Sequence, residues 1–249
     1  MKKTWLIIIS LIILSLIVYL NRSYAHIYAK IEAIGLRSPD QQHLYLIGNN
    51  MTSTKQIIYA ALGDSLTAGV GAAAYEQSFP YLLAQKLATS GTAMRLIDLA
   101  VPGAKSEDVI ASQLDQAIAS RPDIITILIG INDIHGLVAA AKFQNNYERI
   151  LNRLDRETQA EIYAIAIPYL GSATLLLPPY NIYYDVQTGD FNAVIKNLGS
   201  QYRFHYIDLY TPTVKIFKHN GPHYSADLFH PSAEGYAWWA QLIYDDINR

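Results

Sequence analysis

Short apolar runs alternate with amphipathic stretches over most of the chain from residue 56 onward. Five of these runs are rich in β-branched and other apolar side chains and have the length of strands: 56–62, 94–99, 123–129, 161–167 and 204–209. Between the runs, apolar positions recur at helical spacing, as in Phe143, Tyr147, Ile150, Leu151 and Leu154, and again in Phe191, Val194, Ile195, Leu198 and Tyr202. Five strands with helices between them predict a parallel sheet covered by helices on both faces.

Two serines mark predicted helix starts. Ser106 is followed directly by two acidic residues, and Ser232 is followed by Glu234. A serine hydroxyl at this position accepts a free backbone N–H, and acidic side chains favour the positive end of the helix dipole. We therefore expect both serines to act as helix caps.

The N-terminus has a different pattern, because Lys2 and Lys3 precede a run without charge from Thr4 to Leu20. As a helix this run spans about 25 Å, which is short for a membrane span and long for the apolar core of a signal peptide. The residues 23–25, Ser-Tyr-Ala, offer a cleavage site for a signal peptidase, whereas Arg22 suits the end of a spanning helix. Both a cleaved signal peptide and a permanent membrane anchor fit.

The charges beside this run predict its orientation. Two lysines before the run and Arg22 after it place the N-terminus inside the cell and the rest of the chain outside the cytoplasmic membrane. The following residues hold scattered Ser, Asn, Gln, Pro and Gly, which is typical of a linker. We predict a signal anchor or signal peptide at 1–21, a stalk or linker at 22–55 and one folded domain at 56–249.

Composition excludes several classes of protein. The chain has 249 residues, 51% hydrophobic and 16% charged, which argues against a disordered protein. Its net charge of −2 and the lack of a dense basic run argue against a nucleic-acid partner. Because the chain has no cysteine, disulfides, thiolate metal sites and thiol nucleophiles are excluded.

Four polar motifs stand after the predicted strands or near the C-terminus. They are Gly-Asp-Ser-Leu-Thr at 63–67, Ala-Val-Pro-Gly-Ala at 100–104, Gly-Ile-Asn-Asp at 130–133 and Asp-Leu-Phe-His-Pro at 227–231. Ligands of parallel sheets bind beyond the carboxyl ends of the strands, so we expect these motifs to meet there. A serine hydroxyl such as that of Ser65 needs a general base, and His230 with Asp227 three residues before it fits that need.

Together the four motifs resemble those of the SGNH, or GDSL, hydrolase family, over about residues 57–247. The resemblance implies an α/β fold, namely a three-layer α/β/α sandwich with a five-stranded parallel sheet of the flavodoxin-like type. It implies Ser65, Asp227 and His230 as catalytic residues, and an oxyanion hole made by the backbone N–H groups of Ser65 and Gly103 and by the Asn132 side chain. It implies neither a cofactor nor a metal. Some members work with a Ser-His dyad assisted by a backbone carbonyl, and in that alternative Asp227 only caps its loop.

The same residues allow other interpretations, which their positions argue against. Asp64 and Asp133 lie inside motifs, but we expect them to shape their turns rather than to do chemistry. The glycines of 69–74 match a dinucleotide-binding pattern, yet they begin well after the strand ends. The histidines at 219, 223 and 230 with Asp227 invite a metal site, but Gly221 and Pro222 interrupt any helix that would align them.

The substrate is less determined by the sequence than the chemistry is. Tyrosines and leucines cluster in 169–184, which we predict to be a long loop overhanging the site, and such a wall suits an acyl chain or a sugar ring. We predict a serine esterase or lipase for carboxylic esters, lysophospholipids and thioesters included. The alternatives are an O-acetylesterase acting on envelope or other carbohydrate, and a catalytically silent, membrane-anchored binding protein. The oligomeric state stays open.

Overall fold

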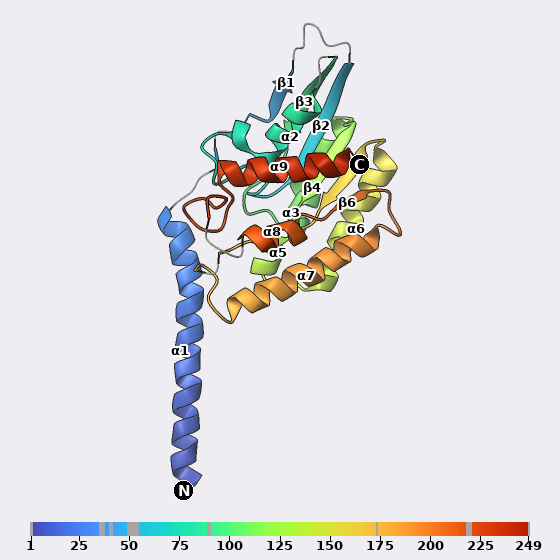
Figure 1. Ribbon diagram of the computed structural model, residues 1–249. Coiled ribbons are helices and arrows are strands. Elements are labelled where there is room, and N and C mark those ends of the chain that lie inside the picture. Colours follow the sequence, from blue (N-terminus) through green and yellow to red (C-terminus); the bar gives the residue numbers. More distant parts are fainter. Residues whose placement is uncertain are drawn as a thin grey trace.

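The structure of the protein is a computed structural model that describes residues 2–34, 38–39, 42–48, 55–88, 91–172, 174–217 and 221–248. One sheet carries helices on both faces, and a long N-terminal helix projects away from it (Figure 1). The strands are β1 (Leu44–Ile47), β2 (Lys55–Gly63), β3 (Thr92–Asp98), β4 (Ile124–Leu128), β5 (Glu161–Ile165) and β6 (His205–Ile207). The helices are α1 (Lys2–Ile34), α2 (Phe79–Leu87), α3 (Ser106–Asp108), α4 (Leu114–Ala119), α5 (Ile131–His135), α6 (Ala140–Glu157), α7 (Tyr180–Leu198), α8 (Tyr210–Phe217) and α9 (Ala233–Ile247).

The sheet follows the predicted pattern and has one strand more. Its order is β1-β3-β2-β4-β5-β6, and β2 to β6 are parallel to one another. These are the five predicted strands, so the prediction of an α/β fold with a parallel sheet is confirmed. Their order is that of the flavodoxin-like doubly wound sheets. All five carboxyl ends therefore meet at one edge of the sheet.

The sixth strand, β1, lies within the segment predicted as a linker. It pairs antiparallel with β3 at the edge of the sheet, with Leu44 opposite Ile97. Only four residues long, it alternates exposed and buried side chains, and Leu44 and Leu46 stay open to solvent. An alternation over four residues is too short to distinguish a strand from a linker in the sequence.

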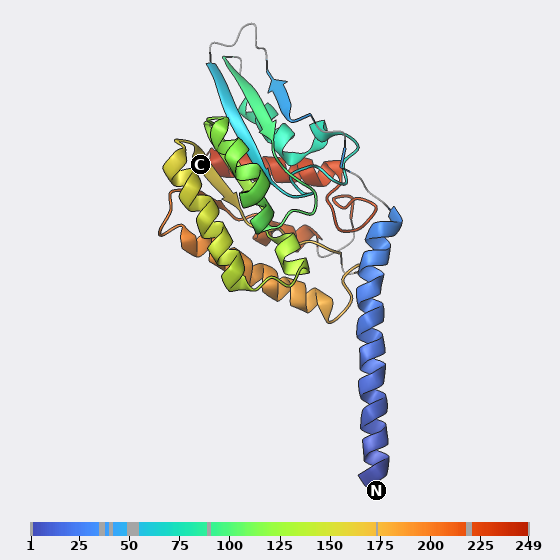
Figure 2. The same cartoon turned by 180° about the vertical axis from the view of Figure 1, so that it is seen from behind.

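Helices cover the two faces of the sheet as separate layers. In Figure 1, α2 and α9 lie side by side over the near face, and Figure 2 shows α6 and the helical segment 106–119 over the opposite face. The apolar stripe predicted for α6 is fully buried: Phe143, Tyr147, Ile150, Leu151 and Leu154 each expose 1% or less. Each such side chain contributes roughly 1.5–3 kcal/mol by leaving water.

The loop predicted at 169–184 is shorter than expected. Helix α7 begins at Tyr180, so the last five residues of the predicted loop form its first turns. The helix contains Gly189 and starts directly after two prolines, and both features weaken a helical pattern in the sequence. The tyrosines of this segment therefore lie partly on a rigid helix.

Helix α1 also extends beyond its prediction. It continues to Ile34, through residues 22–34 of the predicted linker, since the first glycine or proline of the chain is Gly35. Its span Lys3–Ile31 is long and apolar enough to cross a membrane, with a mean hydropathy of 2.3, as a signal sequence also is. Ser23 and Ile27 expose only 3% and 4%, so this part of the helix packs against the rest of the protein.

Candidate active site

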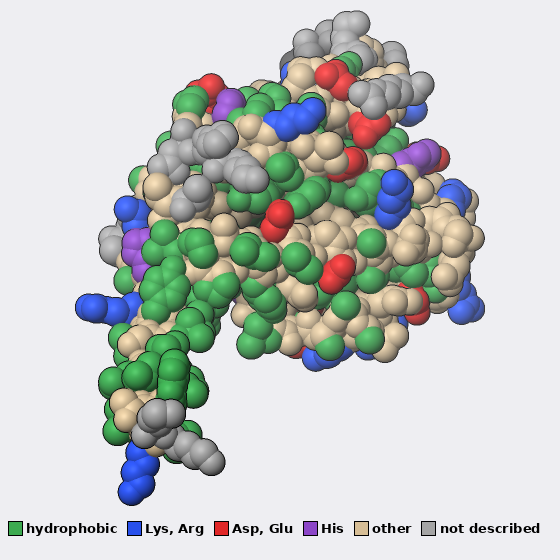
Figure 3. All heavy atoms as spheres, turned by 60° about the horizontal axis from the view of Figure 1, so that its bottom comes forward, with side chains coloured by type: hydrophobic (Ala, Val, Ile, Leu, Met, Phe, Trp, Pro, Cys, Tyr) green, Lys and Arg blue, Asp and Glu red, His purple; other side chains and the backbone are tan. Residues whose placement is uncertain are grey.

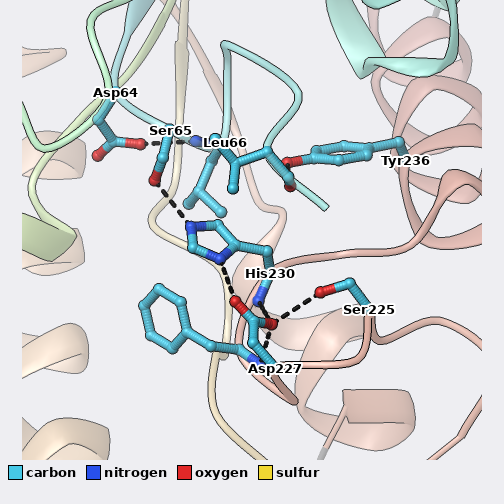
Figure 4. A network of polar contacts seen from close by, with 9 residues as sticks. Asp64, Ser65, Leu66, Ser225, Asp227, His230 and Tyr236 are labelled. Carbon is cyan, nitrogen blue, oxygen red and sulfur yellow. Dashed lines mark hydrogen bonds and ion pairs between the residues drawn. The ribbon is translucent and has the colours of Figure 1, made fainter. Parts of the chain in front are cut away.

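The four polar motifs meet at the carboxyl ends of the parallel strands. Ser65 follows β2, Gly103 follows β3, Asn132 lies in α5 directly after β4, and His230 lies in the loop before α9. In Figure 4, the side chains of Ser65, His230 and Asp227 form one line of polar contacts. The structure thus brings together a serine and a histidine that are 165 residues apart.

Two hydrogen bonds join these three side chains. The Oγ atom of Ser65 lies 3.0 Å from Nε2 of His230, and Nδ1 of the same ring lies 2.6 Å from Oδ2 of Asp227. Because an ionised carboxylate only accepts, we assign the ring hydrogen to Nδ1, which leaves Nε2 to accept the serine hydroxyl. Asp227 is fully buried, whereas Ser65 keeps 9% of its surface exposed. Such a chain can move the serine proton to the imidazole.

The carboxylate of Asp227 receives four hydrogen bonds. Oδ1 accepts the backbone N–H groups of Phe229 and His230, each at 2.9 Å, and the hydroxyl of Ser225 at 2.7 Å, while Oδ2 accepts the imidazole. Burial raises the pKa of Asp227, but the hydrogen bond and charge of His230 and the other donors lower it further, so the pKa lies below its ordinary value. The carboxylate therefore stays ionised at neutral pH.

The turn that presents Ser65 is held by Asp64. The Asp64 carbonyl accepts the N–H groups three and four residues later, at 3.1 and 2.9 Å, and its Oδ1 accepts the N–H of Leu66 at 3.0 Å. The expectation that Asp64 shapes its turn is confirmed. The turn does not lead straight into a helix, however, since successive turns follow it and α2 begins only at Phe79.

Gln113, which the sequence analysis does not single out, fixes the end of β2. Its Oε1 accepts the N–H of Gly63 at 2.9 Å and its Nε2 donates to the Gly63 carbonyl at 2.8 Å. Gln113 is 1% exposed and ends the π-helical turn Val109–Gln113. Gly63 needs to be glycine, because a Cβ there would lie 2.1 Å from the Thr67 hydroxyl. Local sequence gives no signal for this clamp, which tertiary packing alone creates.

A close approach at Gly71 joins the serine turn to the histidine loop. Its φ of +101° is left-handed, and a Cβ would lie 2.3 Å from the carbonyl oxygen of Pro231 and 3.0 Å from Cβ of His230. One residue earlier, the Val70 carbonyl accepts the hydroxyl of Tyr236 from α9 at 2.7 Å. These contacts account for the glycine at 71 without a nucleotide ligand.

The three predicted oxyanion donors follow three adjoining strands, β2, β3 and β4. Among the described residues, no protein group accepts the N–H of Ser65 or of Gly103. Gly103 has a left-handed φ of +83°, and the space beside its Cα is open. Asn132 differs, because its Nδ2 donates to the Ala104 carbonyl at 3.0 Å and to Oδ2 of Asp64 at 3.3 Å. Its amide therefore ties the Gly103 loop to the Ser65 turn.

Asp133 anchors the short helix that carries Asn132. Its carboxylate accepts both the backbone N–H of Ser106 at 2.8 Å and the Ser106 hydroxyl at 2.6 Å. The expectation that Asp133 shapes its own turn is therefore incomplete, since the carboxylate bridges to α3. The predicted cap at Ser106 is wrong for the same reason. Helix α3 begins at Ser106, but the Ser106 hydroxyl donates to the Asp133 carboxylate and does not cap the helix. Ser232 does cap α9, accepting the N–H of Gly235 at 3.1 Å.

An apolar wall with one histidine closes the site on the α7 side. The ring of His135 lies 5.0 Å from that of Tyr184 and 5.3 Å from that of Phe229, measured between centroids. Leu176, from the loop before α7, lines the same narrow cavity. Burial and the charge of His230 lower the pKa of His135 to about 4, so the ring is neutral at physiological pH. The wall is therefore apolar in character.

The rejected alternatives gain no support from the geometry. Within the ranges that the structure describes, no three histidine, aspartate or glutamate side chains are placed to hold a metal ion. His219, one of the four residues considered for such a site, lies outside the described residues. His223 stacks on Phe217 and Trp238 instead, with centroid distances of 6.0 and 5.7 Å.

Known proteins are similar to this chain in sequence and in fold. Residues 61–238 match the GDSL-like lipase/acylhydrolase family. The chain is 30% identical over 202 residues to the spore germination lipase LipC of Bacillus licheniformis, an alignment that covers 72% of this chain and 90% of LipC.

Solved structures agree with the fold. The extracellular lipase of Streptomyces rimosus superposes with a TM-score of 0.57 at 23% identity, covering 77% of this chain and 98% of the lipase. The acetylxylan esterase Axe2 of Geobacillus stearothermophilus superposes with a TM-score of 0.60 at 17% identity, covering 78% and 94%. From the family match and the relationship to LipC, the chain belongs to the GDSL-like lipase/acylhydrolase family and is a carboxylic ester hydrolase.

Proposed function

We propose that Ser65 is the nucleophile of this hydrolase and His230 its general base. The observation that carries the proposal is the hydrogen-bond chain from the Ser65 hydroxyl through His230 to Asp227. As Oγ attacks the ester carbonyl, its proton moves to Nε2; the imidazolium then gives that proton to the leaving alcohol, and an acyl-enzyme remains on Ser65. Water activated by the same imidazole releases the acid and restores the serine.

In this mechanism Asp227 orients the base. Its short bond to Nδ1 fixes the tautomer in which Nε2 accepts a proton, and its negative charge stabilises the imidazolium that forms. The four donors around the carboxylate favour this role over a dyad in which a backbone carbonyl holds the ring.

The negative charge that develops on the substrate oxygen needs fixed donors. The N–H groups of Ser65 and Gly103 are the first two, and the amide of Asn132 is the third. Since Asn132 already donates to Asp64 and Ala104, its bond to the oxyanion must replace or share the long 3.3 Å bond to Asp64. Each donor is expected to contribute about 3–4 kcal/mol to transition-state stabilisation.

For the substrate we propose a lipid ester, with a lysophospholipid as one candidate. The apolar wall of His135, Tyr184 and Phe229 suits an acyl chain, and the relative LipC is named a lipase. An O-acetylesterase is the competing proposal, and the likeness to Axe2 is compatible with it. An acetyl group would leave most of the wall unused.

We further propose that α1 is an uncleaved anchor with the catalytic part outside the cytoplasmic membrane. Before the possible cleavage site, Ser23 exposes only 3% of its surface, and the Tyr19 hydroxyl donates to the Pro178 carbonyl at 2.8 Å. A helix that is removed needs no such contacts. Intact mass separates the two forms, since a chain beginning near residue 26 contradicts the anchor.

The first experiment is hydrolysis of p-nitrophenyl esters from acetate to palmitate by the full chain, in detergent, with the Ser65→Ala variant beside it. Loss of roughly 10⁴- to 10⁶-fold in kcat is expected for the variant. A preference for long chains favours the lipid ester, and a preference for acetate favours the O-acetylesterase. Retention of activity in Ser65→Ala contradicts the proposed nucleophile.

The alternative of another class, a silent binding protein, has its own test. A fluorophosphonate reacts with an activated serine whatever the preferred ester, so wild-type protein should be labelled and Ser65→Ala should not. A folded wild-type chain that stays unlabelled beside a reactive serine esterase supports the silent interpretation.

A further inference from the structure

Exposed apolar side chains lie on segments at the end of the molecule that holds the active site. Outside α1, the described residues include six large hydrophobic side chains that are exposed, and two of them lie on the edge strand β1. The other four all belong to segments at the carboxyl ends of the strands, with exposed fractions of 46%, 75%, 62% and 54%: Val101, Leu137, Ile182 and Val186. Scattered single residues of this kind need no explanation, but their gathering at one end of the molecule does.

Each of these positions is close in sequence to a residue of the site described above. Val101 lies two residues before Gly103, and Leu137 lies two residues after His135. Ile182 and Val186 are four residues apart on α7, so they share one face of the helix that contributes Tyr184 to the apolar wall. Figure 3 shows hydrophobic side chains, interspersed with polar and acidic ones, on the face beside α1.

Leu137 has an unfavourable backbone conformation and an unfavourable exposure to water. Its φ of +54° is left-handed, a conformation that glycine and asparagine adopt far more readily than leucine. Three quarters of its side chain face solvent. Neither the backbone nor water favours a leucine here, so a ligand or partner that covers it is the simplest account.

Contacts between α1 and the start of α7 fix where this face lies along the length of α1. The hydroxyl of Tyr19 donates to the Pro178 carbonyl at 2.8 Å, and the hydroxyl of Tyr180 donates to the Leu20 carbonyl at 3.3 Å. Residues 19 and 20 end the apolar run of α1, where a spanning helix leaves the hydrocarbon. Tyrosines favour that boundary. The start of α7, two residues before Ile182, is thereby fixed at the membrane surface.

The charges near the face fit an interfacial position. The Nζ atom of Lys105 lies 2.9 Å from the place of a Cβ on Gly136, so the ammonium lies beside the residue that precedes Leu137. A lysine beside apolar side chains is typical of contact with lipid headgroups. The acidic Asp185 lies between Ile182 and Val186 in sequence, and its carboxylate accepts the hydroxyl of Tyr210.

We propose that Leu137, Ile182 and Val186 dip into the outer surface of the same bilayer that α1 crosses, so that the Ser65 site takes its ester directly from the membrane. The occupant of the face is thus phospholipid. The proposal rests on the proposed role of α1 as an anchor, and it adds a second membrane contact made by the catalytic domain.

The test uses the full chain in vesicles of phosphatidylethanolamine and phosphatidylglycerol. Because the chain has no cysteine, a single introduced cysteine gives one site for an environment-sensitive fluorophore. The variants are Ile182→Cys on the face, Leu46→Cys on β1 as a control of similar exposure, and Ile12→Cys in α1. Some of the lipids carry a nitroxide, which quenches only fluorophores in contact with lipid.

The proposal expects quenching at residues 12 and 182 and none at 46. A quenched label at 12 with an unquenched label at 182 overturns the docking while leaving the anchor. An unquenched label at 12 overturns the anchor, and the docking with it. An apolar emission at 182 without quenching assigns the face to another protein and also overturns the proposal.

Activity gives an independent readout. The triple variant Leu137→Ser, Ile182→Ser, Val186→Ser should hydrolyse a vesicle-borne ester roughly tenfold more slowly or worse, and soluble p-nitrophenyl acetate at the wild-type rate. The pair Leu44→Ser, Leu46→Ser should change neither rate. Equal rates of the triple variant and wild type on the vesicle-borne ester contradict the docking. If the triple variant fails on the soluble ester as well, its fold is disturbed and the labelling result decides.

Discussion

Two buried carboxylates lie on either side of the Ser65 hydroxyl, and their surroundings differ. Asp227 receives four hydrogen bonds, one from His230, and its pKa is lowered in spite of burial. Asp64 receives the N–H of Leu66 and a long bond from Asn132, and burial raises its pKa to about 7. Burial raises the pKa of both carboxylates, and the number of donors and a cationic partner decide whether that rise is outweighed.

The two charge states suit the two carboxylates to different roles. An ionised Asp227 can hold a histidine and stabilise its charge, whereas an Asp64 that is partly protonated near neutral pH is suited to shaping a turn. Asp64 directly follows a glycine, and Asp227 lies three residues before a histidine. These patterns do not show that the two carboxylates differ in charge.

The strongest test of this comparison removes the charge from each carboxylate in turn. Asp227→Asn should lower kcat by roughly 10³- to 10⁴-fold, because the amide favours the wrong imidazole tautomer. Asp64→Asn keeps an acceptor for the N–H of Leu66 and should lower kcat about tenfold or less. Steady-state kinetics on one p-nitrophenyl ester measures both. An Asp227→Asn variant within tenfold of wild type would mean that a backbone carbonyl suffices to hold His230.

A second prediction concerns the side chain that bonds Asp64. Asn132→Ala removes a proposed oxyanion donor and the tie between the Ser65 and Gly103 loops, and should lower kcat by about 10²- to 10³-fold. The matched control is Asn152→Ala, on the exposed side of α6, which should leave kcat unchanged. Near wild-type turnover by Asn132→Ala would exclude the amide from the oxyanion hole.

The third prediction extends the comparison to a partly buried base, His135, for which the described part of the chain shows no hydrogen-bond partner. Below pH 6.5 the unfolded His135 gains a proton, whereas the folded ring stays neutral down to about pH 4, so wild type loses stability as the pH falls from 6.5 to 4. His135→Phe keeps the ring packing and removes this loss. Relative to wild type, its free energy of unfolding should rise by about 2 kcal/mol from pH 8 to pH 5, measured by chemical denaturation. The same difference at both pH values would contradict the burial of a neutral ring.

The smallest expected effect sharpens the comparison by taking one donor from Asp227. Ser225→Ala removes the 2.7 Å bond and about 1 kcal/mol, and should lower kcat tenfold or less. The pKa of Asp227 should move back toward its ordinary value. The stability that the ionised carboxylate contributes is lost as the pH falls through its folded pKa, so acid unfolding should begin at a higher pH. Ser200→Ala, at an exposed serine that bonds the Asn197 carbonyl, should shift nothing.

The sequence predicts the strands and motifs of this protein better than the contacts between residues that are far apart in the chain. Five strands and their parallel order follow from apolar runs such as 123–129, and the motifs identify Ser65 and His230 as partners before any coordinates are known. Strand β1 is missed because four residues carry too little pattern. The true length of α1 is missed because polar residues after Leu20 suggest a linker, although nothing there breaks a helix.

The parts of the site that sequence does not predict are contacts across the chain. Gln113 clamps Gly63 from a π-helical turn, and Tyr236 bonds the Val70 carbonyl from the last helix. Neither residue has a local signature, because each acts through a partner that only the folded topology brings near. Asn132 is predicted as a donor, but the sequence gives no sign that its amide is already shared between two acceptors.

The junction at Gly71 has a consequence for the synthesis of the enzyme. A ribosome delivers Ser65 early and His230 only after another 165 residues, and the close approach of Gly71 to Pro231 cannot form before then. Tyr236, which secures the same junction, arrives later still. A chain that is still being synthesised therefore carries a serine without its base, and it cannot hydrolyse an ester by the proposed mechanism.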